Sequence, residues 1–205
     1  MAAGGRSQGP AASSPLIAQP GPVKTETVSF RPRDAVYPEE LADNGVQGMA
    51  EVLVQLSAEG VPSDVSVFST SRSTGLDQAA MKAVKKLRFK SGEPGKALTA
   101  VVVPVEFKRD SVNTLSQKTC AEFNVDVSYF KTTFPEQTTR KMDVINMSVG
   151  VIASFGLAGL SQDKAMAYIR KLEAAAKGIV DACAANPEAA YMKTFAGLVE
   201  SSGGR

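Results

Sequence analysis

The chain has 205 residues, 23 of them basic and 21 acidic, so its formal net charge is only +2. Such a balance creates no overall field that favours nucleic acid or an anionic surface. Histidine is absent, which excludes Ser-His-Asp and Cys-His catalysis and histidine-based metal sites. The acidic residues are scattered without catalytic context, so we expect a protein that is not an enzyme and binds no cofactor or metal.

The first 24 residues are rich in Ala, Gly, Pro, Ser and Gln. This composition is typical of an extended, disordered linker. The opening residues lack the basic start and apolar run of a secretory signal peptide. We therefore expect either a cytosolic protein or one whose targeting segment is missing from this chain.

Two alternating runs after the linker predict a β-hairpin. A short helical turn at residues 39–43 comes first, and Asn44-Gly45 would end it. From Gly48 the apolar residues have a period of two, and they share one face of a strand: Ala50, Val52, Val54 and Leu56. Glu59-Gly60 supplies the turn, and the alternation resumes over residues 61–69.

A helix and a third strand follow the hairpin. The helix has Ser73 or Thr74 as its N-cap and an apolar stripe made of Leu76, Ala79, Ala80, Ala83, Val84 and Leu87. Residues 91–95 break the chain, and residues 98–108 predict a strand that contains Pro104. Because proline cannot donate to a ladder, we expect this strand to lie at a sheet edge or to carry a bulge. An exposed edge can accept a partner strand.

Residues 114–200 predict an all-α part of about four helices. The first carries Cys120, Phe123, Val127 and Phe130 on one side. The apolar run at 144–160 is short for a membrane span, so we expect a buried helix of a small bundle. Ser161 can cap a long Ala-rich helix over 163–185, and Asn186-Pro187 can start a final helix that ends near Val199.

The two cysteines, Cys120 and Cys183, are too few for a structural zinc site without histidine. They leave two alternatives, a disulfide or two buried free thiols. A disulfide would imply an oxidising compartment and would stabilise the chain by roughly 4 kcal/mol.

Several short motifs between residues 30 and 109 resemble the C-terminal domain of TonB, the periplasmic energy transducer. In chain order they are Tyr37-Pro38, Gly45-Val-Gln-Gly48, Glu59-Gly60-Val61, the series from Val65 to Ser71, Ala79 to Val84, Leu87 to Lys90, Gly92 to Gly95, and Val101 to Phe107. Members of this family fold as β-β-α-β, as the periodicity also predicts. They typically carry a membrane helix and a proline-rich spacer, of which residues 1–24 would be a remnant.

The resemblance also implies a binding mode. In the TonB family this domain binds outer-membrane receptors by strand addition along its third strand. The implied partner-binding residues here are those of the third strand, Val101, Val103, Val105 and Phe107. Pro104 lies within this docking strand, and whether a strand with a proline still accepts a partner is the question that the sequence raises.

A second, weaker resemblance concerns the helical part. Thr119 to Phe123 and Gly178 to Pro187 resemble segments of HdeA, a small helical acid-stress chaperone of the periplasm whose single disulfide joins similarly placed cysteines. The resemblance implies a disulfide between Cys120 and Cys183. It favours the periplasm, as the TonB resemblance does.

We therefore expect an α+β protein with a linker at 1–24, a TonB-like domain at 25–110 and a separate HdeA-like all-α domain at 114–200. The TonB-like domain would contain an antiparallel three-stranded sheet. We expect a periplasmic protein that binds envelope partners such as a TonB-dependent receptor, with a homodimer also considered. We expect neither nucleic-acid binding nor membrane insertion by this chain. The alternative is an acid-stress chaperone that acts through the helical domain.

Overall fold

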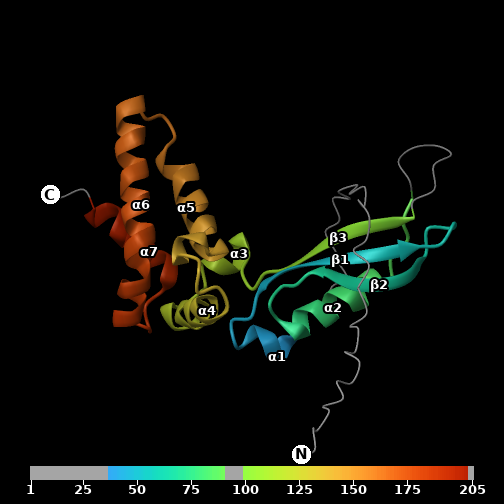
Figure 1. The fold of residues 1–205 in the computed structure, drawn as a ribbon. Coiled ribbons are helices and arrows are strands. Elements are labelled where there is room, and N and C mark those ends of the chain that lie inside the picture. The colour runs from blue at the N-terminus through green and yellow to red at the C-terminus, as the bar shows by residue number, and fades with distance from the viewer. Residues whose placement is uncertain (1–36, 91–98, 203–205) are drawn as a thin grey trace, which may run out of the picture.

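The computed structural model describes residues 37–90 and 99–202, so the predicted linker at 1–24 and the predicted break at 91–95 lie outside the described residues. The described elements are α1 (Glu39–Ala42), β1 (Gly48–Leu56), β2 (Pro62–Ser69), α2 (Thr74–Val84), β3 (Ala100–Phe107), α3 (Val112–Leu115), α4 (Cys120–Thr133), η1 (Thr139–Lys141), α5 (Asp143–Gly156), α6 (Gln162–Ala185) and α7 (Tyr191–Ser201). A three-stranded sheet with α2 occupies one end of the molecule, and α4 to α7 occupy the other (Figure 1).

The sheet is antiparallel with the strand order β2-β1-β3, and α2 packs on one of its faces. This confirms the β-β-α-β order that periodicity predicts. The alternating residues of β1 meet the stripe of α2 in a core that contains Ala50, Val52, Val54, Leu76, Ala80 and Val84, all with no exposed surface. Sheet and helix thus bury one face each, as a single-layer sheet under one helix requires.

A glycine turn connects the two strands of the hairpin, and a serine cap begins α2. Gly60 has φ 75°, and a side chain there would place its Cβ 1.9 Å from the Phe89 carbonyl oxygen, so only glycine fits this turn. Ser73 is the N-cap of α2, with its hydroxyl accepting from the Leu76 N–H. The helix ends at Val84, and Leu87 packs against the core from beyond the helix end.

Helices α4 to α7 enclose a second core. Its largest fully buried side chains are Leu115, Phe123, Ile145, Ile179, Tyr191 and Phe195. Four longer helices agree with the expected number, and the short α3 and η1 are additional. The last helix begins at Tyr191 rather than at Pro187, so the predicted start was wrong.

The shifted start of α7 has a physical reason. The carbonyl oxygens of Pro187 and Ala189 accept the N–H groups of Ala121 and Cys120, each at 2.8 Å. These N–H groups belong to the first turn of α4, where no partner exists inside the helix. The turn before α7 therefore caps α4 instead of starting a helix.

Cys120 and Cys183 form a disulfide that joins the first residue of α4 to the last turn of α6. Both cysteines are fully buried in the helical core. The disulfide alternative is thus confirmed over the free thiols.

Helix α5 only partly fulfils the expectation of a buried helix. Val144, Ile145 and Ser148 in its first half are buried, whereas Phe155 near its end is 83% exposed. Among the helices described, none combines the length and the apolar character needed to cross a membrane. The exposed end of α5 is therefore an unusual surface that the sequence pattern did not predict.

We predict that replacing both cysteines by serine destabilises the helical part. The disulfide closes a segment with a sequence separation of 63 residues, and loss of such a closure costs roughly 4 kcal/mol in the chain-entropy treatment. The measurement is urea unfolding followed by circular dichroism at 222 nm. Free-thiol titration of the unfolded wild-type protein without reductant should detect no thiols, and two titratable thiols there would contradict the structure.

Candidate protein-binding edge

Strand β3 is a terminal strand of the sheet. It pairs with β1 along its whole length, from Ala100 opposite Gln55 to Phe107 opposite Gly48, without a register shift. In the part of the chain that the structure describes, no strand pairs with its other side. The predicted position at an edge is thus confirmed, and the alternative of a bulge is not needed.

The direction of each backbone group of β3 follows from one hydrogen bond. The Leu56 N–H donates to the Thr99 carbonyl at 2.9 Å, which makes these two residues a hydrogen-bonded pair. Such pairs alternate along an antiparallel ladder with pairs whose N–H and C=O groups point away from each other. The odd-numbered residues 101–107 therefore direct their backbone groups to β1, and the even-numbered residues 100–106 direct theirs to the open side.

Pro104 belongs to the outward-facing set. It lies opposite Glu51, and its missing N–H is on the open side, where it interrupts no bond with β1. Proline is tolerated in sheets at such edge positions. The open edge thus keeps the donors of Ala100, Val102 and Glu106 and lacks one in the middle.

The four residues that the TonB resemblance implies for partner binding lie in the core of the sheet unit. Val101, Val103 and Val105 have no exposed surface, and Phe107 is 3% exposed. Their side chains pack under α2, and their backbone groups face β1. They position the strand, whereas the groups available to another strand belong to the residues between them.

Strand β2 forms the other edge of the sheet and is less regular. Its pairing with β1 shifts register between Glu51 and Val52 and again between Gln55 and Leu56. Register shifts bend a strand and increase its twist, which makes an edge a poorer template. β3 is therefore the better candidate for strand addition.

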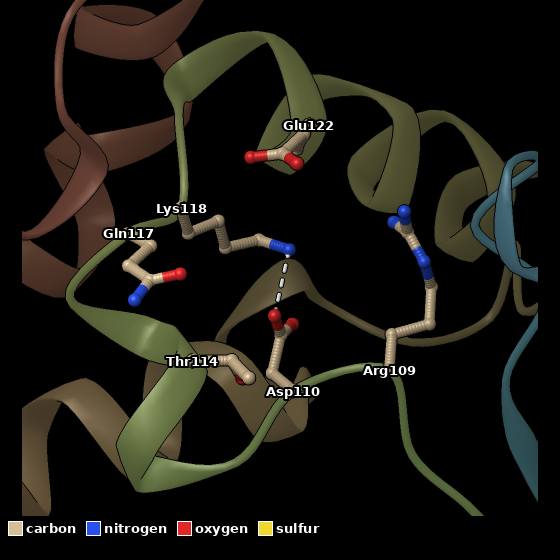
Figure 2. A pocket seen from close by; sticks show the side chains of 6 residues that line it. All are labelled: Arg109, Asp110, Thr114, Gln117, Lys118 and Glu122. Carbon is tan, nitrogen blue, oxygen red and sulfur yellow. Dashed lines mark hydrogen bonds and ion pairs between the residues drawn. The ribbon is translucent and has the colours of Figure 1, made fainter.

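A buried cluster of charges lies directly after β3. Asp126 of α4 is fully buried and forms ion pairs with Arg109 and with Lys118, whose Nζ lies 2.7 Å from Oδ2. Lys118 also binds Asp110 at 2.9 Å (Figure 2). Burial raises the pKa of the Asp126 carboxyl, and the two neighbouring cations offset this only in part. The cluster joins the end of the sheet unit to the helical part.

A pocket of about 180 Å³ opens beside the cluster. Figure 2 shows its lining, which consists of Arg109, Asp110, Thr114, Gln117, Lys118 and Glu122. The described residues contain no group of carboxylates and cysteines that could hold a metal ion. Two of its lining residues, Lys118 and Asp110, form an ion pair with each other.

A second contact joins the two parts through Arg72. Arg72 Nη1 donates to the Thr133 carbonyl at 2.8 Å, Nη2 pairs with Glu136 at 2.7 Å, and the guanidinium lies 4.7 Å from the Phe134 ring centroid. Arg72 has φ 66°, a conformation that costs a residue with a side chain roughly 1–3 kcal/mol. The strained backbone of Arg72 thus places its guanidinium in three contacts with residues at and after the end of α4.

Sequence reasoning missed both contacts. Asp126 did offer a signal, because it lies three residues after Phe123 and one before Val127, on the side of α4 predicted to be apolar. A charged residue on a buried helix face needs a partner. Which partners it finds, Arg109 and Lys118, depends on how the two parts meet and could not be read from spacing.

We predict that Lys118→Met destabilises the protein by roughly 3–5 kcal/mol at neutral pH, because it leaves a buried carboxylate with one cation fewer. The folded-state pKa of Asp126 is raised, so its charge is unfavourable above that pKa and disappears as the pH falls through it. The cost of Lys118→Met should therefore shrink towards acid pH. Chemical unfolding across a pH series measures this.

The matched control is Lys108→Met. Lys108 is 42% exposed and pairs with the exposed Glu106, and such surface pairs contribute at most about 1 kcal/mol. An equal cost for both variants, or a cost of Lys118→Met that grows with acid, would contradict a structural role for the buried cluster.

Comparison with known proteins covers the sheet unit. Residues 33–109 match the family described as Gram-negative bacterial TonB protein C-terminal. Two proteins named Protein TonB, from strain B100 and a second strain of Xanthomonas campestris pv. campestris, are each 40% identical over 73 residues, which is 35% of this chain and 33% of each relative. The chain thus spans about a third of the length of these relatives.

No solved structure matches the chain. The family match ends at Arg109, so the HdeA-like interpretation of residues 114–200 stays a prediction. The unit that carries the regular edge of β3, which pairs with no second strand among the described residues, is the part of the chain similar to the C-terminal domain of TonB.

Proposed function

We propose that this protein binds an extended segment of an envelope protein by strand addition to β3, in a TonB-type transport role in the periplasm of a Gram-negative bacterium. A TonB-dependent outer-membrane receptor is the partner that the family match favours. The observation that carries the proposal is the open edge of β3, which pairs without a register shift along its eight residues. A regular edge of this kind is a template for a further strand.

The proposed contact uses the backbone rather than the core side chains. The buried Val101, Val103, Val105 and Phe107 hold the strand flat against β1 and α2. The partner would pair with the outward N–H groups of Ala100, Val102 and Glu106 and with the carbonyl groups on the same open side of β3. Pro104 supplies only its carbonyl, so the partner leaves one acceptor without a donor at this position.

The helical part limits where a partner can lie. Arg72 and the cluster around Asp126 fix it at the Phe107 end of β3 (Figure 1). An added strand would therefore have the whole of β3 as its template and the helical part at one end. This arrangement supports a bound segment of about the length of β3.

We predict that Glu106→Pro weakens binding of receptor-derived extended peptides about two- to tenfold, because it removes one outward donor without breaking a bond to β1. Glu106→Ala is the matched control, since it removes the same exposed side chain and keeps the donor. Titration followed by NMR should show the shifts of the amides at 100 and 102 saturating at the same peptide concentration in the wild type and in Glu106→Ala, and at a higher concentration in Glu106→Pro.

Pro104→Val tests the same edge in the opposite direction. It adds the missing donor, and one further backbone hydrogen bond contributes roughly 0.5–1.5 kcal/mol. The affinity for the same peptides should rise about two- to tenfold. No shift along residues 99–107, or equal binding by Glu106→Pro, would rule out strand addition to β3.

A second candidate is an acid-stress chaperone that acts through the helical part. The observation that favours it is the buried Cys120–Cys183 disulfide, which agrees with the disulfide implied by the HdeA resemblance. On this candidate the whole chain suppresses aggregation of an unfolding client protein at acid pH and less so at neutral pH, as light scattering would report. An absence of protection at every pH would reject it.

A further inference from the structure

The α5–α6 hairpin projects beyond the other helices of the helical part (Figure 1). The second half of α5, the turn at 157–161 and the first two turns of α6 form its tip. Helix α7 spans 11 residues and packs along the 24-residue α6, so it covers only part of that helix. Among the helices described, none therefore covers the tip on at least one side (Figure 1).

Exposed apolar side chains concentrate at this tip. Nine large hydrophobic residues of the described chain are exposed, and four of them lie within residues 155–169: Phe155 at 83%, Leu160 at 37%, Met166 at 49% and Ile169 at 39%. Single exposed apolar residues are ordinary, whereas a group of them marks an interaction site.

The exposed Phe155 continues the core stripe of α5. Val144, Ser148, Val151 and Phe155 follow one another at spacings of four, three and four residues, which places them on one face of the helix. The first two are buried, and Ser148 forms a hydrogen bond with Tyr191 at the start of α7. Val151 is half-buried, and Phe155 is exposed.

The charges around the tip have a definite arrangement. Residues 144–162 contain no Asp, Glu, Lys or Arg, and within 163–171 three basic residues stand against the single acid Asp163. The three are Lys164, Arg170 and Lys171, and none of them forms a salt bridge with another residue of the described chain. The tip thus has an apolar end followed by these three basic residues, which we call the basic collar, although the chain as a whole is nearly neutral.

We propose that the tip of the α5–α6 hairpin docks on an anionic phospholipid surface. Phe155 and Leu160 would enter the boundary between headgroups and acyl chains, and the basic collar would contact the lipid phosphates. The hairpin lies at the surface in this arrangement and does not cross the bilayer. The proposal goes beyond the expectation from the sequence, which is that this chain does not insert into a membrane.

Charge favours a lipid surface over a second copy of the chain. Two copies that met at this tip would bring two collars of the same sign together, which disfavours association. An anionic surface attracts the same collar. The projecting shape of the tip also suits insertion into a boundary layer better than a flat interface between two proteins.

The test is co-sedimentation of the full chain with vesicles of phosphatidylglycerol and phosphatidylcholine in equal parts. We expect partitioning onto these vesicles, weaker binding at high salt, and much weaker binding to vesicles of phosphatidylcholine alone. Phe155→Ser should lower partitioning at least about tenfold. Replacing Lys164, Arg170 and Lys171 together by glutamine should lower it by about a hundredfold, since each basic residue contributes about fivefold.

The matched control is Val112→Ser, which removes another exposed apolar side chain, 62% exposed on α3, and should bind vesicles like the wild type. Circular dichroism verifies that each variant keeps its helices. Unchanged partitioning of Phe155→Ser would overturn the proposal, as would equal binding to both kinds of vesicle. A dimer seen by sedimentation velocity without vesicles and lost in Phe155→Ser would assign the tip to a second copy instead.

Discussion

The arrangement of the molecule depends on one buried carboxylate, Asp126. It lies in α4 without exposed surface and receives Arg109 from the residues after β3 and Lys118 from the residues before α4. A buried charge must be paired, and separating the sheet unit from the helical part would break the pair between Arg109 and Asp126. The ion pairs therefore stabilise the relative position of the two parts, which is not fixed by the connecting chain alone.

This constraint gives β3 two roles. One side of the strand completes the sheet, and its continuation at Arg109 and Asp110 enters the charge cluster. A partner strand on the open side would lie on a strand whose end is fixed to the helical part. The Arg72 contacts with Glu136 and Phe134 hold the same two parts at the start of α2, so a pull on the edge would be resisted at two separate places.

Much of the fold could be predicted from the sequence because its signals are local. Alternation from Ala50 to Leu56, the Ser73 cap and the apolar stripe of α2 each depend on neighbours in the chain. The start of α7 could not be predicted, since Pro187 and Ala189 cap a helix far away in sequence. The partners of Asp126 and the exposure of Phe155 likewise depend on where other helices lie. For the edge, Pro104 indicated the strand position, whereas the outward-facing residues required the register.

Pro104 also affects which strands the edge accepts. If two copies of β3 paired with each other in antiparallel fashion, each would bring a missing donor, and two carbonyl groups would go unsatisfied. A strand from another protein would face the missing N–H of Pro104 only once. At this position it can place a residue whose carbonyl group accepts a hydrogen bond from water instead. The proline ring thus makes pairing of β3 with a second copy of itself costlier than pairing with a different segment.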